Sequence, residues 1–207
     1  MHTEDHHRSS EGSMPEGALR VAIIVGSTRP GRKAANVAAW VHEIAEDRDD
    51  AIFEVVDIAD YALPLLDEPV PPMAAQYTQP HTHAWAVTIA SFDAFVFVSP
   101  EYNHSSSAAL KNAIDFLFAE WNDKAAGLVT YGVDGGVRAA EHLRLVLGEL
   151  KVADVRSAVS LCFGEDFEGF DAFTPRDVQR ENVTGMLDEL VAWARALRPI
   201  REPAPVG

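Results

Sequence analysis

Short apolar segments of strand length alternate along this chain with longer segments in which apolar residues recur at helical spacing. The clearest run spans residues 94–98, and an uninterrupted run of this kind is typical of a strand covered on both faces in a parallel sheet. Four more runs predict strands, and these lie at residues 19–25, 53–58, 125–131 and 155–161.

Helices are predicted between and after these strands by apolar residues three and four positions apart. After residues 94–98, for example, Leu110 and Ile114 lie on one apolar side, while Lys111 and Asp115 form an i,i+4 pair on the other. Strands that alternate with helices favour a doubly wound α/β domain. We predict a five-stranded parallel sheet in the flavodoxin-like order 2-1-3-4-5, with helices on both faces. The other predicted helices lie near residues 37–45, 80–91, 136–150 and 178–197.

The remaining segments set the domain boundaries. Residues 1–18 are polar, which predicts a flexible tail, and residues 198–207 are proline-rich and predict a second tail. Residues 19–197 then form one α/β domain, which is long enough to bury a sizeable core. Within it, residues 59–72 predict a long loop, and residues 163–176 predict an irregular acidic loop.

Composition narrows the classes of partner. The chain has 207 residues, with 17 lysines and arginines against 32 aspartates and glutamates, so its net charge of −15 repels nucleic acids and anionic membranes. No apolar run approaches the roughly 20 residues of a membrane-spanning helix. The single cysteine, Cys162, excludes an internal disulfide, and the start lacks the pattern of a secretory signal. We therefore expect a cytoplasmic protein that binds neither nucleic acid nor membrane.

Candidate chemistry gathers where the first, third and fourth strands end, because these ends share one edge in the predicted order. The first turn, GSTRPGR, combines Ser27, Arg29 and Arg32 with a helix start, where the helix dipole favours an anion. A dinucleotide fingerprint would need glycine at Thr28, and a P-loop would need lysine and a hydroxyl after Gly31. A terminal monophosphate is the best match, and the alternative is a plain helix start whose basic residues face solvent.

The second turn, PEYN, suits a planar ligand. Pro100 stiffens the backbone, whose N–H groups up to Asn103 can donate to a ring, and Tyr102 is available for stacking. We expect Glu101 to act through its backbone more than through its carboxylate.

The third turn, YGVDGG, follows the fourth strand from Tyr131 onward. Gly132, Gly135 and Gly136 would let a flat ligand lie against bare backbone. The helix that starts after them points its positive pole at one ring edge, which would stabilise the negative charge of a reduced flavin. The alternative is that this turn only reverses the chain.

The chain resembles the NAD(P)H-dependent FMN reductases of flavodoxin-like fold over about residues 20–197. The resemblance lies in three motifs: GSTRPGR, the block PEYNHS with LKNAID, and YGVDGG. The resemblance implies FMN as cofactor and NAD(P)H as co-substrate, with the phosphate at Ser27 and Arg29, the ring against residues 100–103 and its edge near residues 131–136. It also implies ping-pong hydride transfer to FMN and then to a quinone, azo compound, metal oxyanion or free flavin. Because the flavin carries the redox chemistry, we name no catalytic residue and no metal ligand.

The chain departs from the family pattern at three positions. Arg32 and Ala34 stand where many relatives have serine and asparagine, and Ser107 replaces a common proline, which we expect to loosen the approach to the next helix.

Phe116 and Trp121 add apolar surface beyond one core stripe, which predicts a partner subunit. The resemblance likewise implies a homodimer or homotetramer whose flavin sites are partly built by the neighbour.

Two other functions remain open. A flavodoxin-type one-electron carrier would bind FMN without nicotinamide turnover, and the acidic surface would suit docking to redox partners. Carriers of that type typically have a phosphate loop without arginines, whereas this loop contains Arg29 and Arg32. The other function is that of a flavin-binding sensor or scaffold in which turnover is incidental.

Overall fold

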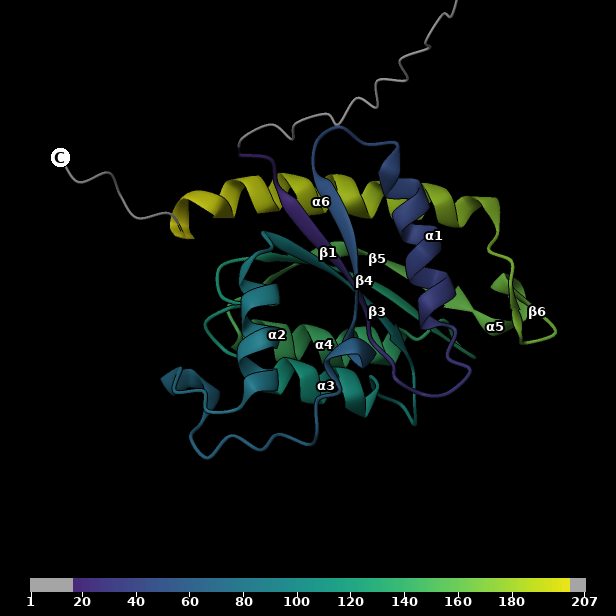
Figure 1. Ribbon diagram of the computed structural model, residues 1–207. Helices are drawn as coiled ribbons and strands as arrows, with labels where there is room; N and C mark the ends of the chain where they lie inside the picture. The colour runs from purple at the N-terminus through teal and green to yellow at the C-terminus, as the bar shows by residue number, and fades with distance from the viewer. Residues whose placement is uncertain (1–16, 202–207) are drawn as a thin grey trace, which may run out of the picture.

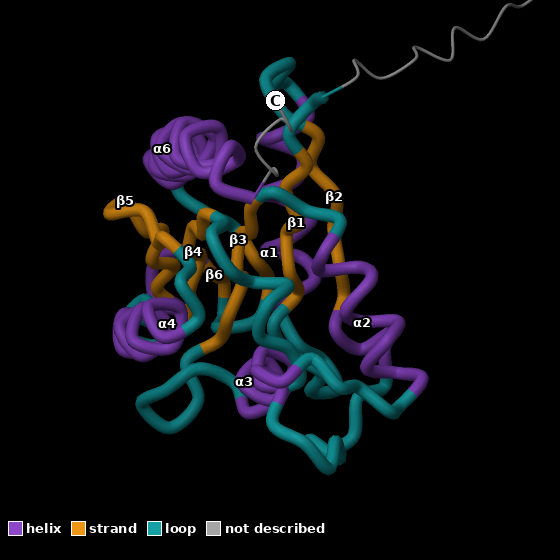
Figure 2. The backbone as a smooth tube through the Cα atoms, turned by 90° about the vertical axis from the view of Figure 1, so that its left-hand side faces the viewer, coloured by secondary structure: helices purple, strands orange, loops and turns teal. Residues whose placement is uncertain are grey.

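The computed structural model describes residues 17–201, so most of both predicted tails lies outside the described residues. Five parallel strands form one sheet in the order β2-β1-β3-β4-β5, which confirms the predicted topology. Figure 2 shows the strands side by side, from β5 at one edge to β2 at the other. The strands are β1 (Arg20–Val25), β2 (Ile52–Asp57), β3 (Ala94–Pro100), β4 (Ala125–Gly132) and β5 (Ala153–Cys162).

Helices cover both faces of the sheet (Figure 1). One face carries α1 (Ala34–Glu46) and α6 (Asp177–Arg201), and the other carries α2 (Pro80–Ala90), α3 (Ala108–Asp115) and α4 (Val137–Glu149). Successive strand residues point to opposite faces, which creates two separate cores. On β1, for example, Val21 and Ile23 join the α1 and α6 side, while Ala22 and Ile24 join the other.

The central strand β3 runs through Pro100, although proline cannot donate a ladder hydrogen bond. Pro100 pairs with Tyr131 of β4, and the next residue, Glu101, donates its N–H to the Tyr131 oxygen at 2.8 Å. The nitrogen of Pro100 therefore faces the side of β1, which has already ended at Val25 opposite Val98. A missing N–H on that side costs no ladder hydrogen bond, so proline is tolerated there.

The proline-rich segment after β2 is a loop fixed onto α3, with two short 3-10 turns, η1 (Ile58–Tyr61) and η2 (Pro72–Ala74). Asn112 of α3 holds it at two points, because its Oδ1 accepts the N–H of Leu66 at 3.0 Å and its Nδ2 donates to the oxygen of Pro64 at 2.6 Å. The loop is long, as predicted, but it is anchored.

The segment after β5 is more regular than predicted. It contains α5 (Phe163–Asp166) and a small hairpin of β6 (Phe167–Glu168) and β7 (Ala172–Phe173). Asp166 holds the two ends of this segment together. It is fully buried, and its carboxylate accepts the backbone N–H groups of Cys162 at 2.9 Å and Arg176 at 3.1 Å. Burial alone would raise the pKa of Asp166, but the hydrogen bonds from Arg176 and Cys162 hold it below its ordinary value.

The last helix, α6, continues to Arg201 through Pro199, past the predicted end of the domain. Arg201 supports this final turn, because its Nη1 donates to the oxygen of Asp123 at 2.8 Å and its Nη2 pairs with Asp93 at 2.5 Å. Part of the predicted C-terminal tail is therefore helix.

Phe116 and Trp121 are not surface residues. Both are fully buried in the core beneath α2, α3 and α4, where Trp121 lies edge-on to Phe95 at 4.9 Å and donates its Nε1–H to the oxygen of Ile114 at 3.1 Å. Since α3 ends at Asp115, the chain turns and tucks these rings inward. The excess apolar surface that we expected is therefore absent, and these two residues give no support to a partner subunit.

Candidate functional site

Three turns meet at the carboxyl edge of the sheet. The first turn, after β1, contacts the second, after β3, because the hydroxyls of Ser27 and Tyr102 lie 3.2 Å apart. The second contacts the third, after β4, through the 2.8 Å hydrogen bond from Glu101 to Tyr131. The residues predicted for a ligand site therefore lie together, as the strand order requires.

Gly26 lets the first turn lie close against its neighbours. A Cβ at this position would lie 2.6 Å from the oxygen of Val98 and 2.9 Å from Cδ2 of Leu110. Ser107, the N-cap residue of α3, donates its hydroxyl to the Gly26 oxygen at 2.5 Å and accepts the N–H of Leu110 at 3.1 Å. Ser107 thus ties α3 to the first turn, and our expectation that it loosens this approach was wrong.

The start of α1 is open to an anion. Its N-cap residue, Lys33, makes no side-chain cap, and its first turn contains no acidic residue. The N–H groups of this turn therefore carry the positive end of the helix dipole without a capping side chain. Arg29 is exposed beside it, with its guanidinium carbon 5.7 Å from the centroid of the Tyr102 ring. This arrangement fits a phosphate dianion.

Arg32 is held differently from Arg29. It forms an ion pair through Nη2 with Asp57, the last residue of β2, whose Oδ1 also accepts the N–H of Ala59 at 2.9 Å. The Nε of Arg32 is buried and has no hydrogen-bond partner among residues 17–201. The ion pair anchors the first turn to β2 and neutralises Asp57 near the anion site.

Tyr131 extends from the end of β4 toward the same turn. Its side chain is buried, and its hydroxyl also has no partner within the described part of the chain. Burial and the neighbouring Tyr102 raise the pKa of Tyr131, while the Ala34 N–H and the guanidinium groups of Arg29 and Arg32 act in the opposite direction. The hydroxyl therefore lies near the start of α1, and the placement of this residue at a ring edge stays a prediction.

The second turn is tight and bonded to itself. Tyr102 and Ser105 exchange both backbone hydrogen bonds, at 2.9 and 3.1 Å, and Asn103 and His104 between them have φ values of 48° and 72°. The N–H groups of Tyr102 and Glu101 are thus used within the protein, so they are not the ring donors that the sequence predicted. Asn103 lies exposed at the tip.

The Glu101 carboxylate closes the start of α4. It accepts the backbone N–H of Arg138 at 3.1 Å and pairs with its guanidinium at 2.6 Å, and the Glu101 side chain is 10% exposed. Arg138 also pairs with Asp134 at 2.8 Å, and these two carboxylates raise the pKa of Arg138. The positive end of α4, which we expected to stabilise a reduced ring, is therefore already capped. Glu101 acts through its side chain as well as its backbone.

The glycines of the third turn are required by the protein's own packing. A Cβ at Gly136 would lie 2.6 Å from the nitrogen of Tyr131, and one at Gly135 would lie 3.0 Å from Cβ of Ser160. Both have positive φ, at 72° and 75°. Gly132 is similarly enclosed. Their missing side chains face the protein, so the placement of a ring against them stays a prediction.

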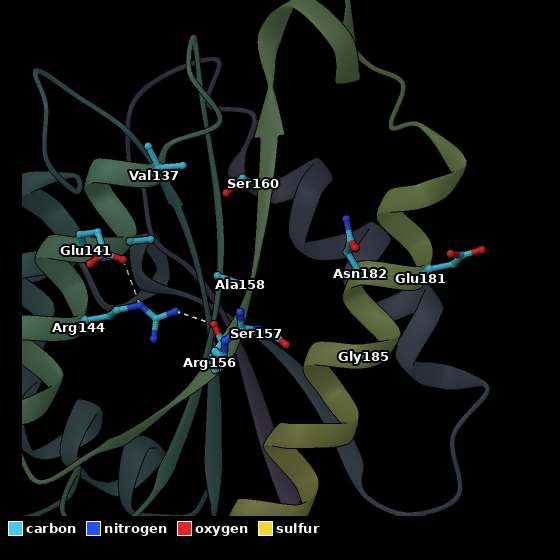
Figure 3. Close-up of a pocket in the computed structure, with 11 residues that line it drawn as sticks. Val137, Glu141, Arg144, Arg156, Ser157, Ala158, Ser160, Glu181, Asn182 and Gly185 are labelled. Atoms are coloured by element: carbon cyan, nitrogen blue, oxygen red, sulfur yellow. Dashed lines mark hydrogen bonds and ion pairs between the residues drawn. The ribbon is translucent and has the colours of Figure 1, made fainter.

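A groove of about 540 Å³ lies between α4, β5 and α6 (Figure 3). Its floor is the free edge of β5, where Arg144 donates to the backbone oxygens of Val155 and Arg156 at 2.9 and 3.0 Å. Glu189 of α6 accepts the N–H of Ser157 at 3.1 Å. These side chains occupy the edge itself, and the groove is not part of the three-turn site.

Two charged residues of the site were not identified from the sequence. Asp57 ends the second strand, which lies beside β1 in the predicted order, so its position could have been noticed. Arg138 follows the paired glycines in the first turn of a helix, but its contact with Glu101 depends on side-chain directions. Among residues 17–201, no group of three or more metal-binding side chains is placed for a metal ion, and no helix there has the length and apolarity to span a membrane.

The topology and the open helix start define a flavodoxin-like α/β protein with an anion site at the carboxyl edge of its sheet. The chain belongs to the NADPH-dependent FMN reductase family, whose model matches residues 19–166. It is accordingly an oxidoreductase with FMN as cofactor and reduced nicotinamide as co-substrate, which confirms the resemblance.

Individual relatives agree with this assignment. The chain is 36% identical over 198 residues to an NAD(P)H-dependent FMN reductase of Schizosaccharomyces pombe, covering 92% of this chain and 91% of that one. It is 28% identical over 195 residues to a 2-hydroxy-1,4-benzoquinone reductase of Burkholderia sp, covering 87% and 99%. Among solved structures, the NAD(P)H:(acceptor) oxidoreductase FerB of Paracoccus denitrificans has a TM-score of 0.68 at 22% identity, covering 87% and 99%, and shares the fold.

Proposed function

We propose that the chain catalyses ping-pong electron transfer from NAD(P)H to a small acceptor, with a quinone as the main candidate. The bound FMN would accept hydride from the nicotinamide and pass reducing equivalents to the acceptor. The observation that carries the proposal is the uncapped start of α1 beside Arg29 and Ser27, at the sheet edge where ligands bind in this fold.

The residues present fit FMN. Ser27, Arg29 and Arg32 would hold the phosphate, because they supply a hydroxyl and two guanidinium groups around an open helix start. The turn from Pro100 to Asn103 would support the ring from one side, and residues 131–136 would lie at its edge. The pair of Glu101 with Arg138 fixes these two turns relative to each other.

The quinone acceptor is supported by the quinone reductases among the relatives, including one from Pseudomonas putida. Azo compounds, metal oxyanions and free flavin are the other acceptors to test.

We also propose a homodimer or homotetramer in the cytoplasm. Its support is the family assignment and the exposed Leu65 and Met73 in the loop along α3, at 84% and 65% exposure.

The test is to titrate the purified protein with FMN and then to follow NADH and NADPH oxidation under air, with and without quinones, azo dyes, chromate or free flavin. The proposal expects tight FMN binding and rapid nicotinamide oxidation that a quinone accelerates. Tight FMN binding without nicotinamide oxidation would instead indicate the one-electron carrier or the sensor. Light scattering measures the number of subunits.

A further inference from the structure

Two buried donors without partners lie near the open start of α1. Tyr131 is 2% exposed, and its hydroxyl has no hydrogen-bond partner among residues 17–201, nor does Nε of Arg32. An unsatisfied buried polar group costs about 1–3 kcal/mol, and such groups are rare in folded proteins. Two of the three that residues 17–201 contain lie at this one place, on β4 and in the first turn. A shared ligand would explain both.

The chemistry around them selects the ligand. The Tyr131 hydroxyl lies near Tyr102, the Ala34 N–H and the guanidinium groups of Arg29 and Arg32. Apart from Tyr102, these neighbours donate hydrogen bonds or carry positive charge. The nearby Asp57 carboxylate is already paired with Arg32. A group that accepts several hydrogen bonds and carries negative charge satisfies such a set, and a phosphate does so.

We propose that the Tyr131 hydroxyl donates a hydrogen bond to the terminal phosphate of FMN, with Nε of Arg32 as a second donor to the same group. This inference rests on the proposed function, and it moves Tyr131 from the ring edge to the phosphate.

The test compares Tyr131→Phe with the wild type in two measurements that move in opposite directions. Without FMN, removing the unsatisfied hydroxyl raises the melting temperature by about 2–4 °C. With FMN, losing a hydrogen bond to a charged group raises the dissociation constant by about tenfold or more. The affinity for riboflavin, which has the same ring but no phosphate, stays unchanged. Calorimetry and flavin fluorescence measure both affinities.

A matched control is Tyr61→Phe. The Tyr61 hydroxyl donates to Oγ1 of Thr88 at 2.8 Å, away from the three turns, so this variant loses a satisfied hydrogen bond. It should lower the melting temperature and leave the ratio of FMN to riboflavin affinity unchanged. A second site variant, Arg32→Lys, keeps a positive charge near Asp57 but lacks Nε, and it should weaken FMN severalfold without affecting riboflavin.

The outcomes separate the inference from the function on which it rests. Wild-type FMN affinity in both Tyr131→Phe and Arg32→Lys would overturn the phosphate role. Equal losses for FMN and riboflavin in Tyr131→Phe would also overturn it, because they would place the residue at the ring. Failure of the wild type to bind FMN at all would contradict the proposed function itself.

Discussion

The helices α1 and α4 begin at the same edge of the sheet, after β1 and β4, yet their starts are treated in opposite ways. The start of α1 has no side-chain cap, no acidic residue in its first turn and two unsatisfied donors nearby. The start of α4 is capped by Glu101, which also pairs with Arg138. Two helix starts at one sheet edge thus give one positive end that is available to an anion and one that holds two turns together.

The contrast shows that a helix start after a parallel strand is not in itself a binding site. Neighbouring side chains decide which pole remains available, and a carboxylate a single strand away is enough to remove it. One glycine from each turn, Gly31 and Gly136, shows the same difference. A Cβ would meet backbone at Gly136, in the closed turn, whereas nothing lies within 4 Å of one at Gly31, in the open turn.

The largest expected effect comes from this pair of glycines. Gly136→Ala should lower the free energy of unfolding by about 3 kcal/mol, because a positive φ and a clash with Tyr131 act together. Gly31→Ala has a similar φ without the clash and should cost only about 1 kcal/mol. Urea unfolding of both variants measures the difference, and equal losses would contradict the account of the closed turn.

The next effect concerns the open pole. Arg29→Ala should weaken FMN binding by roughly 1–3 kcal/mol, the range for losing a hydrogen bond to a charged group. Arg180→Ala is the control, since Arg180 pairs with Glu43 on the surface between α6 and α1. Calorimetry that finds the two variants equal in FMN affinity would remove Arg29 from the site.

Glu101→Gln removes the negative charge that caps the start of α4. Losing the charged cap should lower stability by about 1–2 kcal/mol, and removing a negative charge beside the proposed ring should make the FMN reduction potential more positive. Asp134→Asn is the control, because Asp134 pairs with Arg138 from a more exposed position, at 58%. A redox titration with unchanged potential in Glu101→Gln would place the ring elsewhere.

A third helix end, the carboxyl end of α2, is closed by the buried amino group of Lys124, which should affect stability alone. Lys124 donates to the oxygens of Ile89 and Ala90 at 2.8 and 3.4 Å, and burial lowers its pKa to about 7 from 10.5. Between these values the unfolded chain binds more protons than the folded one, so stability should rise with pH by up to about 1.4 kcal/mol per unit.

Replacing Lys124 tests whether burial lowers its pKa. Lys124→Met should flatten the rise in stability between about pH 7 and pH 10.5, which are the folded and unfolded values. FMN affinity should not change, because Lys124 lies at the opposite edge of the sheet from the three turns. A pH profile of unfolding identical to that of the wild type would contradict the lowered pKa of Lys124.

The sheet and the cluster of turns could be predicted because both depend on local periodicity and spacing. The run at residues 94–98 is the central strand, and the turns after β1, β3 and β4 lie at the carboxyl edge in any sheet of this order. The pairing of Glu101 with Arg138, and the burial of Phe116 and Trp121, depend on where the chain turns after α3 and on side-chain directions. No one-dimensional pattern contains that information, so these features were missed or misread.

The outer edge of β5 has a consequence for assembly. Arg144 and Glu189 already engage the backbone groups that an added strand from another molecule would need. The sheet therefore cannot grow sideways past β5 without breaking these interactions. Copies of the chain that associate on this side must meet through helices or loops, which protects the β5 edge from fibre-like stacking at high concentration.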